Sequence, residues 1–529
     1  MSVIDNEKYT AISPAEFFLR YREIAGFANP ARALYQAVRE LVENALDATD
    51  AHGILPSIKV VIRKADPIQD FYKVTVEDNG IGLPPHIVPE AFGRVLFSSK
   101  YVLRQTRGMF GLGVKVAALY AQMTTGKPIE VITSKPNLKF IYYFKLRIDV
   151  HKNEPVVLEK GSWRKTRNWH GTVVSLTLEG DWSRARSKIL EYIARTAVAT
   201  PYANIVLVTP DNEIVYYERV VNKLPKPPKE VKPHPHGIDL ETLKKIINST
   251  SYKTVYDLLV KNFQSIGEVT AKAVLKQAEI PSSINPKKLG ETELLRLVET
   301  MKNYKKYKPP KADALSPLSS EIIVAGLKRM YNPEFVEAVT RRPSTYHGYP
   351  FIVEVGIAYG GNTPLSDKDK PVLLRYANKI PLLYDEGSDV ITSVVKEDIA
   401  WSNYLVELPA PILVLVHICS TKVPFKGVGK ESIADVPEVR REVKLGILEV
   451  ARRLRRYLAK KIKEEEIRKK IVSIAKYIPE VVRALTIISD GPGVSREELE
   501  EKLVNIIVAR TGLSSTDIKR VIDSVEIGA

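Results

Sequence analysis

Two proline-rich, basic stretches constrain the organisation of this chain more than any other feature. They cover residues 224–237 (LPKPPKEVKPHPHG) and residues 307–317 (YKPPKADALSP). Proline fixes an extended backbone and removes a hydrogen-bond donor, so such stretches are typical of linkers rather than of helices or strands. We therefore expect three folded parts, with boundaries close to these two linkers.

The parts between the linkers differ in their patterns. Residues 1–228 mix helical and strand patterns, whereas residues 229–307 are mainly helical. Residues 308–470 contain strand patterns at 351–359 and 412–418 and end in a long charged helix at 436–467, and residues 471–529 form a further small helical segment. A chain of 529 residues with 44% hydrophobic residues can bury several cores. The sequence therefore predicts an α+β multidomain protein.

Composition excludes several classes of protein. A single cysteine, Cys419, excludes a disulfide framework and a cysteine-rich zinc site. The neighbouring His234 and His236 stand in a proline-rich stretch without a second pair, so we expect solvated linker histidines rather than metal ligands. No apolar run reaches the roughly 18 residues of a membrane helix, and the N-terminus has no signal-peptide pattern. These features predict a cytoplasmic protein without a membrane partner.

The net charge is the one feature of composition that hints at a partner. The formal charge is +17 and the pI is near 9.4. A polyanion such as nucleic acid is one explanation. A generally lysine-rich surface, as in thermophile proteins, explains the charge equally well.

A strongly patterned helix is predicted at residues 29–50. Asn29 suits the N-cap and Pro30 the first helical position. An apolar stripe at helical spacing consists of Leu34, Val38, Leu41, Ala45 and Ala48. A second face carries Glu40, Glu43, Asn44 and Asp47. Side chains of this kind repel one another unless something compensates them, so the face is either an ordinary acidic surface or a functional one.

A strand pattern with a polar end follows at residues 72–82 (YKVTVEDNGIG). Its alternating apolar residues lead to Asp78, which stands directly before a glycine-rich turn with Gly80 and Gly82. A carboxylate there can accept a hydrogen bond from an amino group, and glycines allow a flat ring to approach the backbone. A simple Asp-Asn-Gly turn is the alternative.

The third pattern is a glycine-rich loop at residues 107–115 (RGMFGLGVK), which opens an apolar helix. Its glycines are Gly108, Gly111 and Gly113. Such a loop can point successive N–H groups at an anion, and the helix N-terminus adds its dipole. It is not a P-loop, because Val114 stands where that motif requires lysine. A flexible hinge is the alternative for the loop by itself.

The order and spacing of these patterns carry more information than any one of them. A fourth short pattern, Gly171-Thr172, opens a strand at residues 172–178. In this order the four resemble the N, G1, G2 and G3 boxes of the GHKL ATPases, the family of the gyrase ATPase chain, MutL, related chaperones and histidine kinases. The similarity covers about the first 225 residues. It implies a GHKL α/β sandwich with ATP and Mg²⁺ as cofactors.

The resemblance also implies a role for each matching residue. Glu40 polarises the attacking water as the catalytic carboxylate, and Asn44 holds Mg²⁺. Asp78 receives the adenine amino group, with Gly80, Gly82 and Thr172 beside it. Ser99 and Lys100 match lid residues that contact nucleotide. The loop that holds the phosphates consists of Gly108, Met109, Phe110, Gly111, Leu112, Gly113, Val114 and Lys115.

The rest of the chain is similar to the B subunits of the archaeal type IIB topoisomerase VI family. Residues 263–278 resemble that family's helix-two-turn-helix insert, and residues 375–389 and 417–434 resemble its α/β transducer domain, which has a ribosomal-protein-like fold. In the transducer a lysine reaches the γ-phosphate. Lys430 is the match, and Lys422 and Lys426 are nearby competitors. A transducer motif that often reads Trp-Lys-x-Tyr in the family is Trp-Ser-Asn-Tyr at residues 401–404.

This second resemblance implies a function for the whole chain. ATP would close two copies into a homodimer, with the residues before Ser13 as a strap across the partner. A DNA-cleaving A subunit would complete a heterotetramer of two A and two B subunits that relaxes and decatenates double-stranded DNA in the nucleoid. The helix at 436–467 is then the arm towards the A subunit, although a solvated packing helix has the same charges. Another GHKL ATPase, of the mismatch-repair or chaperone type, or a DNA-binding scaffold with a relic ATP site, is the alternative.

Overall fold

The computed structural model describes residues 11–99, 101–108, 111–427, 429–488, 495–511, 515–516, 518–519 and 522. The chain forms two compact units. The first extends to Ala400 and includes Glu407–Ala451, and the second consists of Trp401–Val406 and the residues from Arg452 onwards. No helix among the described residues is long and apolar enough to cross a membrane.

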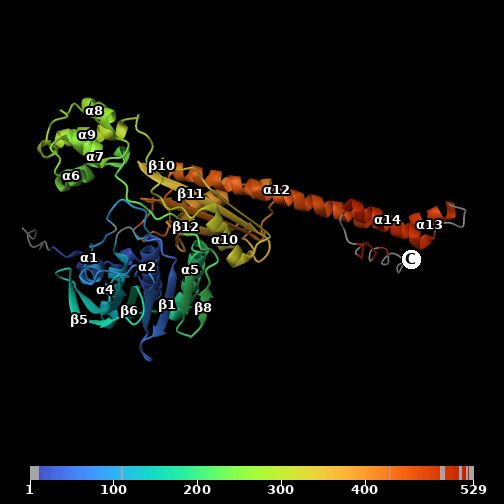
Figure 1. Cartoon of the computed structure of the whole chain (residues 1–529), viewed down its shortest axis with the longest axis horizontal. Helices are drawn as coiled ribbons and strands as arrows, with labels where there is room; N and C mark the ends of the chain where they lie inside the picture. The colour runs from blue at the N-terminus through green and yellow to red at the C-terminus, as the bar shows by residue number, and fades with distance from the viewer. Residues whose placement is uncertain are drawn as a thin grey trace, which may run out of the picture. The chain divides into compact units, whose positions relative to one another are not determined.

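The N-terminal part of the first unit is an eight-stranded sheet covered by helices (Figure 1). The strand order is β5-β4-β3-β6-β2-β1-β7-β8, and among these pairs only β1 and β7 run parallel. The strands are β1 (Ser57–Lys64), β2 (Phe71–Asp78), β3 (Ile129–Ser134), β4 (Phe140–Asp149), β5 (Glu154–Arg164), β6 (Gly171–Glu179), β7 (Asn204–Val208) and β8 (Ile214–Tyr217). The helices are α1 (Pro14–Arg20), η1 (Arg22–Ala25), α2 (Pro30–Asp50), α3 (Val88–Gly93), α4 (Gly113–Thr125) and α5 (Trp182–Ala199).

Helix α2 forms where the sequence predicts it. The Asn29 side chain accepts a hydrogen bond from the Arg32 N–H at 2.9 Å and caps the helix. Its apolar residues are buried in one core with α4, α5 and the sheet. In β2 every second residue is buried, and Asp78 continues that alternation at the end of the strand. Because side chains alternate between the two faces of a strand, Asp78 lies on the same buried face of β2 as Tyr72, Val74 and Val76.

The second part is a small helical domain with its own core. Its helices are α6 (Leu240–Ser249), α7 (Val255–Asn262), α8 (Glu268–Gln277) and α9 (Glu291–Asn303). The expectation of solvated histidines in the preceding linker is wrong. His234 is only 3% exposed and its Nε2 lies 3.1 Å from the Lys308 carbonyl oxygen, while His236 Nε2 lies 2.9 Å from that of Tyr304. The two linkers pack against each other, which buries His234 and partly buries His236. No local pattern reveals this contact.

The third part is built on a second sheet. The strand order is β10-β11-β14-β12-β13, and β9 pairs with β11. The strands are β9 (Phe335–Thr340), β10 (Ser344–Tyr346), β11 (Tyr349–Tyr359), β12 (Val372–Ala377), β13 (Ile380–Pro381) and β14 (Ile412–Ser420). The predicted strands at 351–359 and 412–418 are confirmed, and β14 is buried along its whole length. Helices α10 (Ser320–Tyr331) and α11 (Val390–Ser393), with η4 (Glu386–Ser388) and η5 (Val394–Asp398), also belong to this part.

The end of helix α5 shares a hydrophobic core with the third part of the chain. Val198, Ala199 and Tyr202 at the end of α5 pack with residues of α10, β12 and β14. Helix α10 approaches α5 closely, since a Cβ at Gly326 would lie 1.9 Å from the Val198 carbonyl oxygen. Contact at this distance requires glycine. The N-terminal part and the second sheet are therefore joined by packed side chains of α5 and α10, and not only by the chain between them.

The predicted charged helix at 436–467 is α12 (Pro437–Ala475), which continues beyond its expected end. Its first turns pack on the second sheet, and a Cβ at Gly446 would lie 2.7 Å from Val355 Cγ2. The division between the two compact units falls within this helix, after Ala451. In the second unit α13 (Ile478–Ile488) and α14 (Arg496–Thr511) pack around a small core. The α+β multidomain prediction is confirmed.

Candidate functional site

A cavity of about 760 Å³ opens between α2, the end of β2, the loop before α4, and the loop that holds Lys430. Three of the four polar residues predicted on α2 line it, because a spacing of four and then three residues keeps side chains on one face. The predicted site residues on its wall are Glu40, Asn44, Asp78, Gly82, Ser99, Gly108, Gly111, Leu112, Gly113, Val114, Lys115, Thr172 and Lys430. Lys100, Met109 and Phe110 lie outside the described residues.

The acidic face of α2 is not uniform. Glu43 does not line the cavity. Its side chain is 2% exposed, and its Oε1 accepts a bond from Arg39 Nε at 2.7 Å. The arginine one turn away neutralises this carboxylate inside the core. The cavity therefore receives Glu40, Asn44 and Asp47, and the repulsion expected among four neighbours is smaller than the sequence suggests.

Glu40 is held against the start of α4. Its Oε1 accepts a hydrogen bond from Gln36 Nε2 at 3.0 Å. A Cβ at Gly113, the first residue of α4, would lie 1.6 Å from Glu40 Oε2, so only glycine leaves room for the carboxylate. The positive end of the helix dipole favours a negative charge at this place. The geometry thus fixes the Glu40 carboxyl group on the cavity wall.

Asp78, at the end of β2, is a buried carboxyl group that also lines the cavity. It is 6% exposed, and its Oδ1 accepts hydrogen bonds from the Gly80 N–H at 2.8 Å and the Thr172 N–H at 3.3 Å. Burial raises the pKa of Asp78 to about 7, although both backbone amides lower it. A carboxylate in such surroundings is a strong acceptor for an amino group of a ligand.

The glycines near Asp78 serve the packing of the protein. Gly82 has φ +66°, and a Cβ there would lie 2.1 Å from the Ser134 carbonyl oxygen. A Cβ at Gly171 would lie 2.0 Å from the Asp78 carbonyl oxygen. Gly80 is not part of the cavity wall. The glycines thus let β2, β3 and β6 come close enough to align Asp78 with Thr172, and the expectation that they also admit a flat ring stays a prediction.

A lysine side chain links the glycine-rich loop to a neighbouring segment by hydrogen bonds. Lys115 Nζ donates to the Phe97 carbonyl oxygen at 2.6 Å and to that of Gly111 at 2.8 Å. Gly111 has φ +60°, and a Cβ there would lie 2.3 Å from Ser98 Cβ. These contacts hold the loop against the segment with Ser99. Lys115 therefore shapes the loop in addition to lining the cavity.

Lys430 reaches the cavity from the second sheet's side of the unit. It is 7% exposed, and its Nζ donates to the Arg107 carbonyl oxygen at 3.3 Å, across 323 residues of sequence. The competing Lys422 and Lys426 are exposed and do not line the cavity. Of the three candidate lysines, only Lys430 is brought to the site.

Helix α2 anchors the loop on both sides of Lys430. Arg32 forms an ion pair with Glu431, and Arg39 Nη1 donates to the Gly429 carbonyl oxygen at 3.5 Å. Further along, Asp389 Oδ2 accepts a hydrogen bond from the Ile433 N–H at 2.8 Å. The position of the lysine is thus set largely by the helix that carries Glu40 and Asn44.

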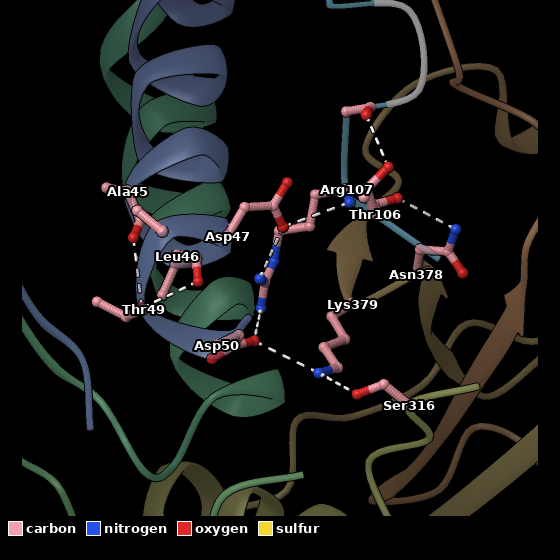
Figure 2. A network of polar contacts seen from close by, with 12 residues as sticks. Ala45, Leu46, Asp47, Thr49, Asp50, Thr106, Arg107, Ser316, Asn378 and Lys379 are labelled. Atoms are coloured by element: carbon pink, nitrogen blue, oxygen red, sulfur yellow. Dashed lines mark hydrogen bonds and ion pairs between the residues drawn. The ribbon is translucent and has the colours of Figure 1, made fainter. Parts of the chain in front are cut away.

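Sequence reasoning missed Arg107 as a site residue. Its Nη1 lies 3.2 Å from Asp47 Oδ1 and its Nη2 lies 2.8 Å from Asp50 Oδ2. Figure 2 shows both contacts. The only local signal was its place directly before Gly108. The two aspartates that it needs belong to a distant helix, and their partnership depends on the fold.

Comparisons with known proteins agree with this arrangement. A family model of the histidine kinase-, DNA gyrase B- and HSP90-like ATPases matches residues 29–178, and one of the topoisomerase VI B subunit transducer matches residues 310–470. The type 2 DNA topoisomerase 6 B subunit of Sulfurisphaera tokodaii is 52% identical over 531 residues, with 99% of each chain covered. The protein of the same name from Metallosphaera sedula is 53% identical over 521 residues, with 97% of each chain covered.

The chain belongs to the family of topoisomerase VI B subunits. The resemblance found in the sequence is therefore confirmed, as are the GHKL ATPase fold and the transducer domain. Membership over nearly the whole chain decides against a mismatch-repair or chaperone ATPase. In the terms of this family, the cavity lies between the ATPase fold and the transducer lysine.

The contact between Gly113 and Glu40 gives a first prediction. In Gly113→Ala the methyl group would take the place of a Glu40 oxygen, so the carboxylate must move away from the cavity wall. We expect ATP hydrolysis to fall roughly 100-fold, the lower range for loss of a positioned acid or base. The matched control is Gly161→Ala on β5, where no atom lies within 4 Å of the added carbon. Equal activity of the two variants would contradict the prediction.

The pKa of Asp78 gives a second prediction. Because this pKa is raised from 3.8 to about 7 in the folded chain, the folded state binds the proton more tightly, and its stability falls as pH rises through this interval. Asp78→Asn has no ionisable group at this position, so the variant does not lose stability in this way as pH rises. We expect the melting temperature of the nucleotide-free variant, relative to the parent, to be higher at pH 8 than at pH 5, while ATP affinity falls at both. A difference in melting temperature that is independent of pH would refute this.

Proposed function

We propose that this chain binds ATP and Mg²⁺ in the cavity and hydrolyses the ATP as the ATPase subunit of a type II DNA topoisomerase. One observation carries the proposal. Glu40 and Asn44 on α2, Asp78 at the end of β2 and Lys430 from the transducer all line one cavity. Family membership supplies the enzyme class, a type 2 DNA topoisomerase with an ATPase-like domain.

Two groups of lining residues suit the two parts of ATP. Asp78 and Thr172 offer an acceptor and a hydroxyl group for the adenine ring. The loop before α4 and the N-terminus of α4 offer backbone N–H groups and a positive dipole for phosphates. The volume of about 760 Å³ lies within the usual range for a small-molecule site.

The side chain of Asn44 is suited to Mg²⁺. Its amide oxygen is a hard ligand, and Mg²⁺ takes its remaining positions from water and phosphate oxygens, so one side chain suffices. When bound, the ion would neutralise charge on the phosphate oxygens. Asp47, which also lines the cavity, is committed to Arg107 and is therefore less suited to bind the ion.

Glu40 and Lys430 would share the chemistry of hydrolysis. Glu40, fixed against α4, would accept a hydrogen bond from the attacking water and orient it towards the γ-phosphorus. Lys430 would exchange its hydrogen bond with the Arg107 carbonyl for one with the γ-phosphate. After hydrolysis that attraction is lost. A cation from the transducer would thereby report the state of the nucleotide.

The partners follow from the proposed function. A DNA-cleaving A subunit would cut the duplex, and two A and two B subunits would form the working enzyme. ATP would close the two B subunits into a dimer, and the proposed strap before Ser13 lies mostly outside the described residues. The net charge of +17 fits a double-stranded DNA substrate held in a prokaryotic nucleoid. Residues 1–228 would bind ATP, and residues 308–470 would transmit its state.

A non-enzymatic scaffold with a relic ATP site is the second candidate. The close fit between Glu40 and Gly113 speaks against it, because a relic site has no need for a glycine at that position. The Lys430 loop is also anchored at several points. Activity measurements separate the two candidates.

Glu40→Gln tests the catalytic role. The amide keeps the size of the side chain but is a poor base, so we expect ATP turnover to fall at least about 100-fold while ATP still binds. Glu213→Gln is the matched control, because Glu213 is exposed beside the distant strand β8 and pairs with the surface residue Arg186. Supercoil relaxation is measured with the A subunit present. Undiminished ATP turnover in Glu40→Gln would remove Glu40 from the mechanism.

Lys430→Met tests the reach of the transducer into the site. The thioether keeps much of the lysine's length but has no charge, so the γ-phosphate loses a cation. We expect ATP hydrolysis to fall by roughly 10-fold or more, with little change in ADP affinity. Lys426→Met, an exposed lysine of the same loop, should behave like the parent. If Lys430→Met loses ADP and ATP affinity equally, Lys430 does not contact the γ-phosphate.

A further inference from the structure

A second transducer lysine is buried against the ATPase side of the unit. Lys379 stands with Asn378 in the two-residue turn between β12 and β13, and both have positive φ, +48° for Asn378 and +70° for Lys379. Asparagine tolerates that conformation, whereas lysine adopts it at a cost in energy. Lys379 is 5% exposed. A strained and buried lysine calls for an explanation by its contacts.

The contacts of this turn reach two segments of the ATPase side and the second linker. Lys379 Nζ lies 3.4 Å from Asp50 Oδ2, at the C-terminal end of α2, and donates to Ser316 Oγ at 2.9 Å. Asn378 Nδ2 donates to the Thr106 carbonyl oxygen at 3.2 Å, one residue before Arg107. Figure 2 shows both side chains with these contacts to α2 and to the segment before the glycine-rich loop.

Asp50 is shared between cations from the two sides. The same Oδ2 that faces Lys379 accepts from Arg107 Nη2 at 2.8 Å and from the Tyr202 hydroxyl at 3.1 Å. Burial opposes ionisation of Asp50, but Arg107 and Lys379 outweigh it, and the pKa is lowered. The carboxylate is therefore ionised and joins a transducer turn to the arginine that precedes the phosphate loop.

The turn is equally well fixed to the transducer sheet. The Lys379 N–H donates to His417 Nε2 at 3.0 Å, so Nε2 is an acceptor and the ring proton is on Nδ1. That Nδ1 lies 2.8 Å from Glu354 Oε2. Glu354 in turn accepts from the Leu318 N–H at 2.6 Å. A chain of buried hydrogen bonds thus runs from Asp50 to β11 and β14.

Arg107 is the residue at which both transducer lysines meet. Its carbonyl oxygen accepts from Lys430, while its guanidinium shares Asp50 with Lys379. In the proposed mechanism Lys430 changes partner when ATP binds. Lys379, Asn378 and Asp50 also line the cavity. The contact between Lys379 and Asp50 uses none of the residues assigned above to the nucleotide, so in the proposed mechanism it persists throughout the cycle.

We propose that Lys379 is a positioning residue that couples ATP hydrolysis to duplex passage. It holds Arg107 through Asp50 and provides a fixed pivot, about which the transducer turns when Lys430 moves between Arg107 and the γ-phosphate. This inference rests on the proposed function of the cavity. The alternative is a structural ion pair with no part in coupling, since buried charges also serve only to satisfy one another.

The test is Lys379→Met in the full chain with its A subunit, with Lys422→Met as the matched exposed control. ATP affinity, ATP turnover and supercoil relaxation are measured together. We expect ATP affinity within about 3-fold of the parent, and the ATP consumed for each relaxed turn should rise roughly 10-fold, because the pivot is lost. Lys379→Arg keeps a cation within reach of Asp50 and should restore most of the coupling.

Three outcomes would overturn the inference. One is unchanged coupling in Lys379→Met. Another is a loss of ATP affinity, turnover and relaxation in equal proportion, as a purely structural role predicts. The third is additive loss of coupling in Asp50→Asn combined with Lys379→Met, because residues that act through one contact are not additive.

A milder variant covers the case in which Lys379→Met does not fold. Ser316→Ala removes one acceptor of Lys379 and leaves the ion pair with Asp50. It should raise the ATP consumed for each relaxed turn by roughly 2-fold. An unchanged amount of ATP for each relaxed turn counts against the pivot.

Failure of the proposed function looks different. In that case the parent itself shows no ATP turnover that depends on Glu40, whatever residue stands at position 379.

Discussion

The contact of Arg107 with Asp47 and Asp50 is the interaction on which the arrangement of the site depends. It joins the segment before the glycine-rich loop to the last turns of α2 in a place that is largely shielded from bulk water. A buried guanidinium needs carboxylates close by, and buried carboxylates need a cation. Each charged group therefore compensates the burial of the others. The same contacts couple the loop that would hold phosphates to helix α2, which would hold Mg²⁺ and the attacking water.

Helix α2 serves several needs at once because a helix turns a new face every few residues. Its apolar face fills the core of the first sheet, and Glu40 and Asn44 face the cavity. A third set of side chains, Arg32 and Arg39, holds the loop of the transducer lysine. One rigid element thus sets the distances between the cavity wall and the transducer. A loop in its place would leave each of those distances to be fixed separately.

The site is built at some cost to stability. Asp78 is buried so deeply that its pKa is raised to about 7, which means that the ionised form suited to an amino group is disfavoured in the folded chain without ligand. Lys379 adopts a backbone conformation that lysine rarely takes. Gly113 leaves the start of α4 without a side chain so that Glu40 has room. Each exception to ordinary packing lies beside the cavity, where a preformed arrangement of charges is useful.

The sequence by itself determined the local chemistry. The helix at 29–50 with Glu40 and Asn44, the strand that ends at Asp78 and the glycines before α4 follow from spacing within single elements, and the ordered motifs indicated the family. Only the tertiary structure decided which polar side chains meet. In the tertiary structure Glu43 forms an ion pair with Arg39, and His234 is buried. Lys379 contacts Asp50, which is 329 residues away in the sequence. Periodicity describes one element at a time, whereas an ion pair depends on how two distant elements pack, and that is set by the shared core.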